Sequence, residues 1–347
     1  MTLQPDDQME LPDLKALLDW RLNNPRPIYR AVSAEPVSSK LRQQLEGWEP
    51  KRRWVSVSQL GSCAKKLAYR RESAPVERTL DARSKRVFAH GSMAEWWMCA
   101  ILEDALHSSG LPWRLSEWNP QRASSIQLGS LEINGHADGS LEYFNGNEWS
   151  GRAILEVKSS NSFAFSRWCK EGLSQDDPYW WQCQGYMMAQ GVNYGYFLAE
   201  CKNSQALYGQ WLRRDASFPE RLEQHLHNAN LPADMAPRQL PDRVQLVPVP
   251  SLYRRKTAKR EIGSPKANHF RLPWQCIYCD YSTRCWGSLI VERLDVNWSG
   301  TPTRSLYMPD PDCADHPRGC PCVGCSMKPP PARPTSGSMQ PLSEAPC

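Results

Sequence analysis

The segment LEINGHADGSLEYFNGNEWSGRAILEVKSS, residues 131–160, decides how this chain folds. Residues 131–144 alternate as a strand does, and Asn145-Gly146 is a strong signal for a hairpin turn. Residues 152–160 predict the returning strand, whose apolar middle consists of Ile154, Leu155 and Val157. The segment therefore predicts two antiparallel strands joined by a tight turn.

Among the charged side chains of this hairpin, Asp138, Glu156 and Lys158 form the candidate site. Residues two apart in a strand face the same side, so Glu156 and Lys158 project together, and the hairpin brings Asp138 alongside them. Two carboxylates on adjacent strands, with the Val157 carbonyl between them, can hold a hard divalent ion such as Mg²⁺. Such an ion would polarise a phosphodiester, while Lys158 would orient or help deprotonate the attacking water. The alternative is a surface hairpin whose charges pair with neighbours, but a Glu and a Lys inside an apolar strand need a specific reason.

The rest of the chain predicts helices and strands around this hairpin. Helical spacing or helix-start signals cover residues 11–22, 58–69, 83–107, 163–173, 179–190 and 218–228, and Ser58 is a plausible N-cap. Further strands are expected over residues 194–201 and 206–212. This order indicates an α/β or α+β domain with a mixed sheet.

Two of these helices carry polar residues in positions that suit the acidic hairpin. Glu95, in Gly91-Ser92-Met93-Ala94-Glu95, could supply a third acidic ligand. Gln182 and Tyr186 are four residues apart and therefore share a helix face, from which both could donate hydrogen bonds to DNA. Taken alone, Tyr186 is better interpreted as an ordinary half-buried helix tyrosine.

The ordered series Gly-x-x-x-Glu, Gly-x-x-Asp, Glu-x-Lys and Gln-x-x-x-Tyr, over residues 55–286, resembles the RecB-like branch of the PD-(D/E)XK nucleases. The resemblance implies a restriction-endonuclease-like α/β core whose mixed central sheet is flanked by helices. It also implies that Asp138 and Glu156 bind Mg²⁺ or Mn²⁺ and that Lys158 is catalytic. Glu95 stands where the branch often has His, and Gln182 and Tyr186 would assist.

The 13 cysteines are spaced unevenly, which favours metal ligation over disulfides. Cys276, Cys279 and Cys285 form a C-x₂-C-x₅-C pattern that needs a fourth ligand, and Cys63 is the best candidate. One Cys before the nuclease core and three after it resembles AddB-type nuclease domains and the CRISPR-adaptation exonucleases. That resemblance implies a structural [4Fe–4S] cluster, with Zn²⁺ as the alternative at the same thiolates. A second group could bind Zn²⁺ or be incidental: Cys313, His316, Cys320, Cys322 and Cys325.

Charge and aromatic residues suggest DNA as the partner. The net charge is +5, but residues 51–86 carry a net of +8 and residues 238–271 a net of +7, which suits a polyanion or, alternatively, solvated faces. The pairs Trp96-Trp97 and Trp180-Trp181 could stack on unpaired bases at single-stranded ends, although core packing is expected for one member of each pair.

The expected organisation is a helical lead-in over residues 1–50, a nuclease domain over 51–297 and a Pro/Cys-rich tail over 298–347 that largely lacks a core. No apolar run is long enough to cross a membrane, and the polar, acidic N-terminus does not read as a signal peptide, so we expect a cytoplasmic protein. No phosphate-binding loop motif is present, and a helicase or recombination partner would therefore be another chain.

These observations predict a metal-dependent exonuclease that acts on DNA ends. Three other functions stay open. They are structure-specific endonuclease action on the same core, a catalytically silent DNA-binding module, and a zinc-stabilised adaptor without chemistry.

Overall fold

The computed structural model describes residues 11–24, 55–76, 82–118, 121, 123–128, 131–229, 247–248, 270–271, 276, 279–286, 291–296 and 302–308. The chain divides into two units, Met1–Arg243 and Val244–Cys347. The predicted domain limits at residues 50/51 and 297/298 lie outside the described residues and stay predictions.

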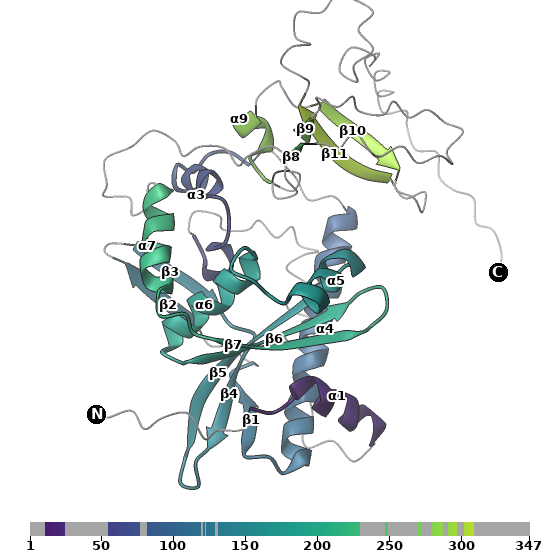
Figure 1. The fold of residues 1–347 in the computed structure, drawn as a ribbon, viewed down its shortest axis with the longest axis vertical. Helices are drawn as coiled ribbons and strands as arrows, with labels where there is room; N and C mark the ends of the chain where they lie inside the picture. Colours follow the sequence, from purple (N-terminus) through teal and green to yellow (C-terminus); the bar gives the residue numbers. More distant parts are fainter. Residues whose placement is uncertain are drawn as a thin grey trace, which may run out of the picture. The chain divides into compact units, whose positions relative to one another are not determined.

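A five-stranded mixed sheet forms the centre of the first unit (Figure 1). Its strands, in spatial order, are β1 (Trp113–Ser116), β4 (Gly139–Phe144), β5 (Trp149–Ser160), β6 (Tyr194–Cys201) and β7 (Leu207–Arg213). β5 and β6 are parallel, whereas the other neighbouring pairs are antiparallel. The parallel pair needs a long crossover, which α5 (Ser162–Glu171) and α6 (Pro178–Gln190) provide.

Helices cover both faces of this sheet (Figure 1). On one face, α4 (Ala82–Ser109) packs its apolar stripe, including Met98 and Leu102, against Leu155 of β5, and α1 (Leu14–Asn23) packs against α4. On the other face, α6 and α7 (Phe218–Asn228) pack against Ile154 of β5 and Phe197 of β6. The alternation along β5 sends successive side chains to opposite cores. The predicted mixed sheet flanked by helices is therefore confirmed.

The hairpin is confirmed at its turn but corrected before it. Gly146 has a positive φ of 96°, and Asn145 Oδ1 accepts hydrogen bonds from two backbone N–H groups of the turn. The predicted single strand over 131–144 is instead two strands. β3 (Leu131–His136) pairs with β2 (Ala123–Leu128) in a separate two-stranded sheet, and only β4 joins the large sheet. Between them the chain crosses from one sheet to the other at Asp138, whose backbone N–H donates to Leu155 at 3.1 Å.

The predicted helix start at Ser58 is also corrected. A short 3₁₀ turn, η2 (Val57–Gln59), is separated from α3 (Ala64–Arg71), and the N-cap of α3 is Cys63 rather than Ser58. The Cys63 sulfur accepts a hydrogen bond from the Lys66 N–H at 3.4 Å. The break falls at Gly61, where a side chain would collide with the backbone of Pro178 at the start of α6.

The second unit contains an antiparallel sheet and a short helix, α9 (Ser282–Trp286). Its strands, in spatial order, are β10 (Val291–Val296), β11 (Pro302–Met308), β9 (Phe270–Arg271) and β8 (Val247–Pro248). β11 lies within the predicted tail, which therefore has regular structure over residues 302–308. The second cysteine and histidine group, residues 313–325, lies outside the described residues. Of the helices that the structure describes, none is apolar over a length that would cross a lipid bilayer.

Candidate active site

The site forms beside β5 at the point where its pairing with β4 begins. β4 begins at Gly139, opposite Leu155, so the next residues of β5 have no β4 partner. Asp138 fills this place with its side chain, since its Oδ2 accepts a hydrogen bond from the backbone N–H of Val157 at 2.7 Å. The start of β4 thus positions the Asp138 side chain against the middle of β5.

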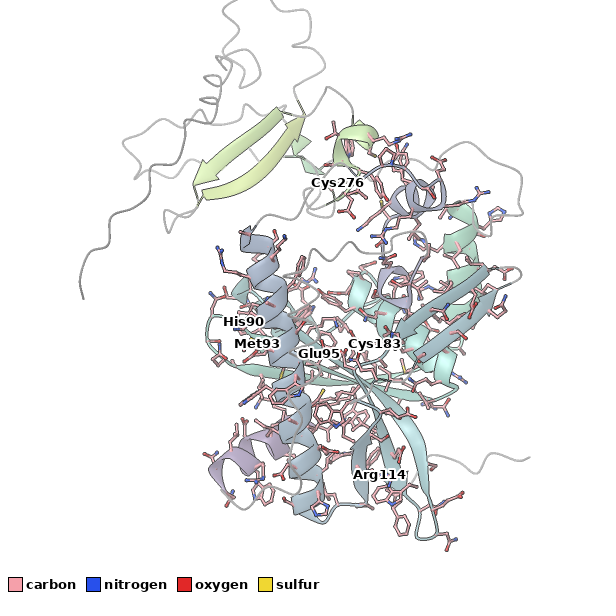
Figure 2. The ribbon with its side chains drawn as sticks, turned by 180° about the vertical axis from the view of Figure 1, so that it is seen from behind. His90, Met93, Glu95, Arg114, Cys183 and Cys276 are labelled. Carbon is pink, nitrogen blue, oxygen red and sulfur yellow. The ribbon has the colours of Figure 1, made fainter. Side chains whose placement is uncertain are left out.

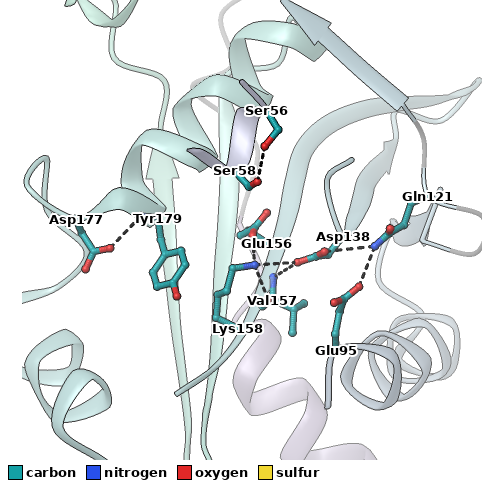
Figure 3. A network of polar contacts seen from close by, with 10 residues as sticks. All are labelled: Ser56, Ser58, Glu95, Gln121, Asp138, Glu156, Val157, Lys158, Asp177 and Tyr179. Atoms are coloured by element: carbon teal, nitrogen blue, oxygen red, sulfur yellow. Dashed lines mark hydrogen bonds and ion pairs between the residues drawn. The ribbon is translucent and has the colours of Figure 1, made fainter. Parts of the chain in front are cut away.

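Lys158 brings the predicted carboxylates together. It forms an ion pair with Glu156, and its Nζ lies 3.6 Å from Oδ2 of Asp138 and 3.0 Å from the Val157 carbonyl oxygen (Figure 3). The three charged residues singled out by the hairpin pattern are therefore neighbours in the fold. Their charges pair within this buried group rather than on a surface hairpin, and the role of the group in metal binding stays a prediction.

Burial determines the electrostatics of this group. Glu156 is 0% exposed, and burial raises the pKa of its carboxyl group, with Lys158 opposing the rise. Burial alone would lower the pKa of Lys158, but the negative charges of Glu156 and Asp138 outweigh it and hold that pKa well above its ordinary value. Lys158 is therefore a cation at neutral pH. One carboxylate oxygen of Glu156, Oε2, is buried and has no hydrogen-bond partner among the described residues.

Glu95 reaches the same region from the other side of the sheet. It lies on α4, whereas Cys183 lies on α6, which packs against the opposite face (Figure 2). The link between Glu95 and the hairpin is Gln121, whose Nε2 lies 2.9 Å from Oε1 of Glu95 and 3.3 Å from Oδ1 of Asp138. Gln121 was not predicted from the sequence, because it belongs to no motif and no spacing ties it to the acidic residues.

Gln182 and Tyr186 share one face of α6, as predicted, but that face is buried. Their exposed fractions are 6% and 2%. The Tyr186 hydroxyl packs against Gly135, where an added Cβ would lie 2.9 Å from it. Burial raises the pKa of Tyr186, and the charges of Glu156 and Asp138 raise it further. Tyr186 is therefore near the acidic group and is hydrogen-bonded to Gln182, and the role of both residues toward DNA stays a prediction.

Tyr179 is a second residue that sequence patterns missed. Lys158 Nζ lies 5.6 Å from the centroid of its ring, a distance that suits a cation–π interaction. Tyr179 is held by Asp177, the N-cap of α6, whose Oδ1 accepts from the Tyr179 backbone N–H at 3.0 Å. The Asp177-Pro178 pair is a helix-start signal that places Tyr179 in the first turn of α6, whereas its contact with Lys158 depends on how the helix packs on the sheet.

The tryptophan pairs divide between the core and the surface. Trp180 is buried and packs on Phe218 at 5.8 Å between ring centroids, which confirms core packing for one member of its pair. Trp97 on α4 is 42% exposed. The most exposed large apolar side chain described is Phe163, at 84%, and it lies in the first turn of α5, five residues after Lys158.

The cysteine segment has local order in the second unit. Cys276 and Cys279 are buried and Cys285 is half-buried. The Cys279 N–H donates to the Cys276 carbonyl at 3.2 Å, and the Cys279 sulfur accepts from the Tyr281 N–H at 3.5 Å. Cys63 belongs to the first unit. Within the described ranges, no three or more His, Cys, Asp or Glu side chains group so that they could hold a metal ion.

The chemistry of the acidic group nevertheless fits a hard divalent ion. Its donors are carboxylate and carbonyl oxygens, which Mg²⁺ and Mn²⁺ prefer. Oε2 of Glu156 is a buried carboxylate oxygen that has no hydrogen-bond partner in the described part of the chain, and its burial costs free energy unless a cation or a donor approaches it. The donors beside the oxygens of this group include the Lys158 ammonium and the neutral Gln121 amide.

No family model and no curated protein matches the chain. Among solved structures, that of SSO0001 is similar over 74% of this chain and 98% of its own, with 15% identity and a TM-score of 0.38. LHK-Exo, an alkaline exonuclease from Laribacter hongkongensis, is similar over 52% of this chain and 87% of its own, with 12% identity and a TM-score of 0.32. Its complex with dAMP is similar over 50% and 88%, with 14% identity and a TM-score of 0.33. At these TM-scores the similarities assign no function, which has to be inferred from the site.

Proposed function

We propose that this protein is a nuclease of the PD-(D/E)XK type that hydrolyses phosphodiester bonds at DNA ends with Mg²⁺ or Mn²⁺. One observation carries the proposal. Asp138, Glu156 and Lys158 meet at the edge of β5, and one oxygen of the fully buried Glu156 lacks a partner among the described residues. A silent DNA-binding module would gain nothing from a buried carboxylate of this kind, because its burial destabilises the charged form.

Asp138 and Glu156 would hold the divalent ion, with Glu95 and the Val157 carbonyl as further oxygen donors. When bound, the ion supplies positive charge that activates water and stabilises the leaving oxygen. Lys158 would donate hydrogen bonds to the attacking water or to the phosphate. It would act as a cation rather than as a base, because the neighbouring carboxylates hold its pKa well above the ordinary value.

The cysteines are proposed to hold a structural [4Fe–4S] cluster, with Zn²⁺ as the alternative. Two features support ligation. Cys276 and Cys279 are close in sequence and buried, and the Cys279 sulfur already accepts a backbone N–H, a contact that stabilises a thiolate. Cys63 lies at the N-terminus of α3, where the helix dipole also favours negative charge. Iron content and absorption near roughly 400 nm would identify the cluster in protein purified without oxygen.

DNA with an unpaired end is the proposed substrate. The highly exposed ring of Phe163 lies close in sequence to Lys158, and an exposed ring can stack on a base that is not paired. The chain's excess of basic residues suits the phosphate backbone. A helicase or recombination partner on another chain could supply such ends.

The test is degradation of end-labelled single- and double-stranded DNA with Mg²⁺ or Mn²⁺, comparing wild type with Lys158→Ala. We expect cleavage that depends on the metal and falls by about 10²–10³-fold in the variant, the usual cost of removing one donor that stabilises charge in the transition state. Lys170→Ala is the matched control, since Lys170 is exposed in the last turn of α5. The pattern of products would distinguish removal of terminal nucleotides from internal cleavage.

DNA binding without cleavage by the wild type, with either metal, would contradict the proposal and favour a binding module. Cleavage by Lys158→Ala at the wild-type rate would place the chemistry elsewhere. Loss of activity in both Lys158→Ala and Lys170→Ala would indicate damage to the fold, which a thermal unfolding curve of each variant would reveal.

A further inference from the structure

Gln121 occupies the position between the two halves of the acidic site. One half consists of Asp138, Glu156 and Lys158, which come from the hairpin, and the other is Glu95 on α4. The amide nitrogen of Gln121 lies 2.9 Å from Oε1 of Glu95 and 3.3 Å from Oδ1 of Asp138, so the two N–H groups of one amide can serve two carboxylates (Figure 3).

Asp138 shows why this bridge matters. Its Oδ2 faces the sheet, where it accepts from the Val157 N–H at 2.7 Å and lies 3.6 Å from Lys158 Nζ. Its Oδ1 faces Gln121. Each oxygen of Asp138 is therefore committed to a different half of the site, and Gln121 is the described link from the sheet to Glu95.

The orientation of the amide is determined by its neighbours. Ionised carboxylates only accept hydrogen bonds, so the Gln121 nitrogen rather than its oxygen has to face them. A divalent cation near Glu95 and Asp138 would reverse this preference, because cations repel an N–H group and attract a carbonyl oxygen. Rotation of the amide about its last side-chain bond exchanges the two atoms without moving the backbone.

We propose that Gln121 is a positioning residue that holds Glu95 against Asp138 in the metal-free protein and turns its amide oxygen toward the divalent ion when that ion binds. This inference rests on the proposed function, and it adds Gln121 to the oxygen donors of the site. In the metal-free state the amide hydrogens offset the repulsion between two carboxylates, and in the bound state the amide oxygen completes the oxygen set.

Two substitutions separate these roles. Gln121→Ala removes both the link and the oxygen, and we expect it to weaken Mn²⁺ binding by about 10–100-fold, the usual effect of losing a residue that orients metal ligands. Gln121→Glu keeps an oxygen but places a third carboxylate against Glu95 and Asp138. We therefore expect it to melt at a lower temperature than wild type without metal, and to gain more in melting temperature from Mn²⁺ than wild type does.

The experiment is isothermal titration of the full chain with Mn²⁺ alone, together with thermal unfolding with and without Mn²⁺. Gln127→Ala and Gln127→Glu are the matched controls, because Gln127 is an exposed glutamine on β2. Both controls should bind Mn²⁺ as wild type does. A merely structural role for Gln121 predicts equal destabilisation of Gln121→Glu with and without Mn²⁺, which would overturn the inference.

Mn²⁺ binding by Asp138→Asn distinguishes a failure of this inference from a failure of the proposed function. If wild type binds Mn²⁺, Asp138→Asn does not, and Gln121→Ala binds as tightly as wild type, the inference is wrong and the proposed site stands. If wild type binds no Mn²⁺, both are wrong.

Discussion

The acidic site and the cysteine segment are both predicted to hold metals, but the chain builds them in different ways. Asp138, Glu156 and Lys158 come from one hairpin, where the Lys158 ammonium pairs with both carboxylates and offsets one of their two negative charges. The predicted cysteine ligands are distributed over two units, with Cys63 in the first and the C-x₂-C-x₅-C segment in the second.

The different origins of the two ligand sets predict different roles for the two metals. The acidic residues of one hairpin are held together by ion pairs and a backbone hydrogen bond, so we expect the ion to contribute to chemistry more than to folding. Thiolates gathered from distant parts of a chain repel one another unless a metal joins them, so a cluster should contribute to folding directly. The predictions below test this contrast.

The largest expected effect comes from exchanging one ligand at each site. Cys279→Ser should lose most of the iron and the absorption near roughly 400 nm, because three ligands do not hold a cluster that uses four. It should also lower the melting temperature markedly. Asp138→Asn should keep the melting temperature close to that of wild type, because the asparagine oxygen can still accept from the Val157 N–H, yet it should lose Mn²⁺ binding.

Thermal unfolding and iron analysis of both variants, in protein purified without oxygen, would make the comparison. Cys169→Ser is the control for the first variant, since Cys169 is an exposed cysteine on α5. Asp176→Asn, an exposed aspartate before α6, is the control for the second. Full iron content in Cys279→Ser would show that this cysteine is not a ligand.

The hairpin could be predicted because its signals are local. Asn145-Gly146 sets the turn, and the spacing of Glu156 and Lys158 places them on one face whatever surrounds the strand. Asp138 was expected beside them for the same reason. The position of its carboxylate, which replaces a strand partner at Val157, depends only on where β4 begins.

Other features depend on packing between distant segments, so local sequence patterns could not predict them. The crossing between β3 and β4 follows from the pairing of β3 with β2. The burial of Gln182 and Tyr186 follows from the packing of η2 on α6, which is so close that a Cβ at Gly185 would lie 2.9 Å from Cγ1 of Val57. Gln121 contacts Glu95 and Asp138 only because the fold brings a motif-free residue between them.

The pH dependence of Mn²⁺ binding is the next prediction. Glu156 holds a cation only as a carboxylate, and burial raises its pKa above the ordinary 4.5. Affinity should therefore be complete above the raised pKa and fall by up to about tenfold for each pH unit below it, since one unit corresponds to roughly 1.36 kcal/mol. Titration calorimetry with Mn²⁺ at a series of pH values would measure this.

The same raised pKa has the opposite effect on the metal-free fold. Because the folded state binds this proton more tightly than the unfolded state, the Glu156 contribution to stability is largest at pH values below 4.5 and is lost as the pH rises through the folded pKa. Glu156→Gln should remove this contribution, and Glu132→Gln, an exposed change on β3, should leave it unchanged. Identical pH profiles for wild type and Glu156→Gln would show that this carboxyl group does not control either equilibrium.

The smallest expected effect tests whether α6 supports the acidic site from the core. A methyl group at Gly135 would lie 2.9 Å from the Tyr186 hydroxyl and 3.0 Å from Cβ of Val57, so both neighbours would have to move. We expect Gly135→Ala to destabilise the protein by about 1–3 kcal/mol, the usual result of overpacking a core. Gly151→Ala is the matched control in a strand, because its methyl group would meet only Ser140 Oγ at 3.7 Å.

Adding Tyr186→Phe to Gly135→Ala removes the nearest colliding atom, the Tyr186 hydroxyl oxygen, and should restore part of the lost stability. Denaturant unfolding of wild type, Gly135→Ala, Gly151→Ala and the double variant measures these differences. Equal stability of Gly135→Ala and Gly151→Ala would mean that α6 shifts easily at this contact and does not support the acidic site from the core.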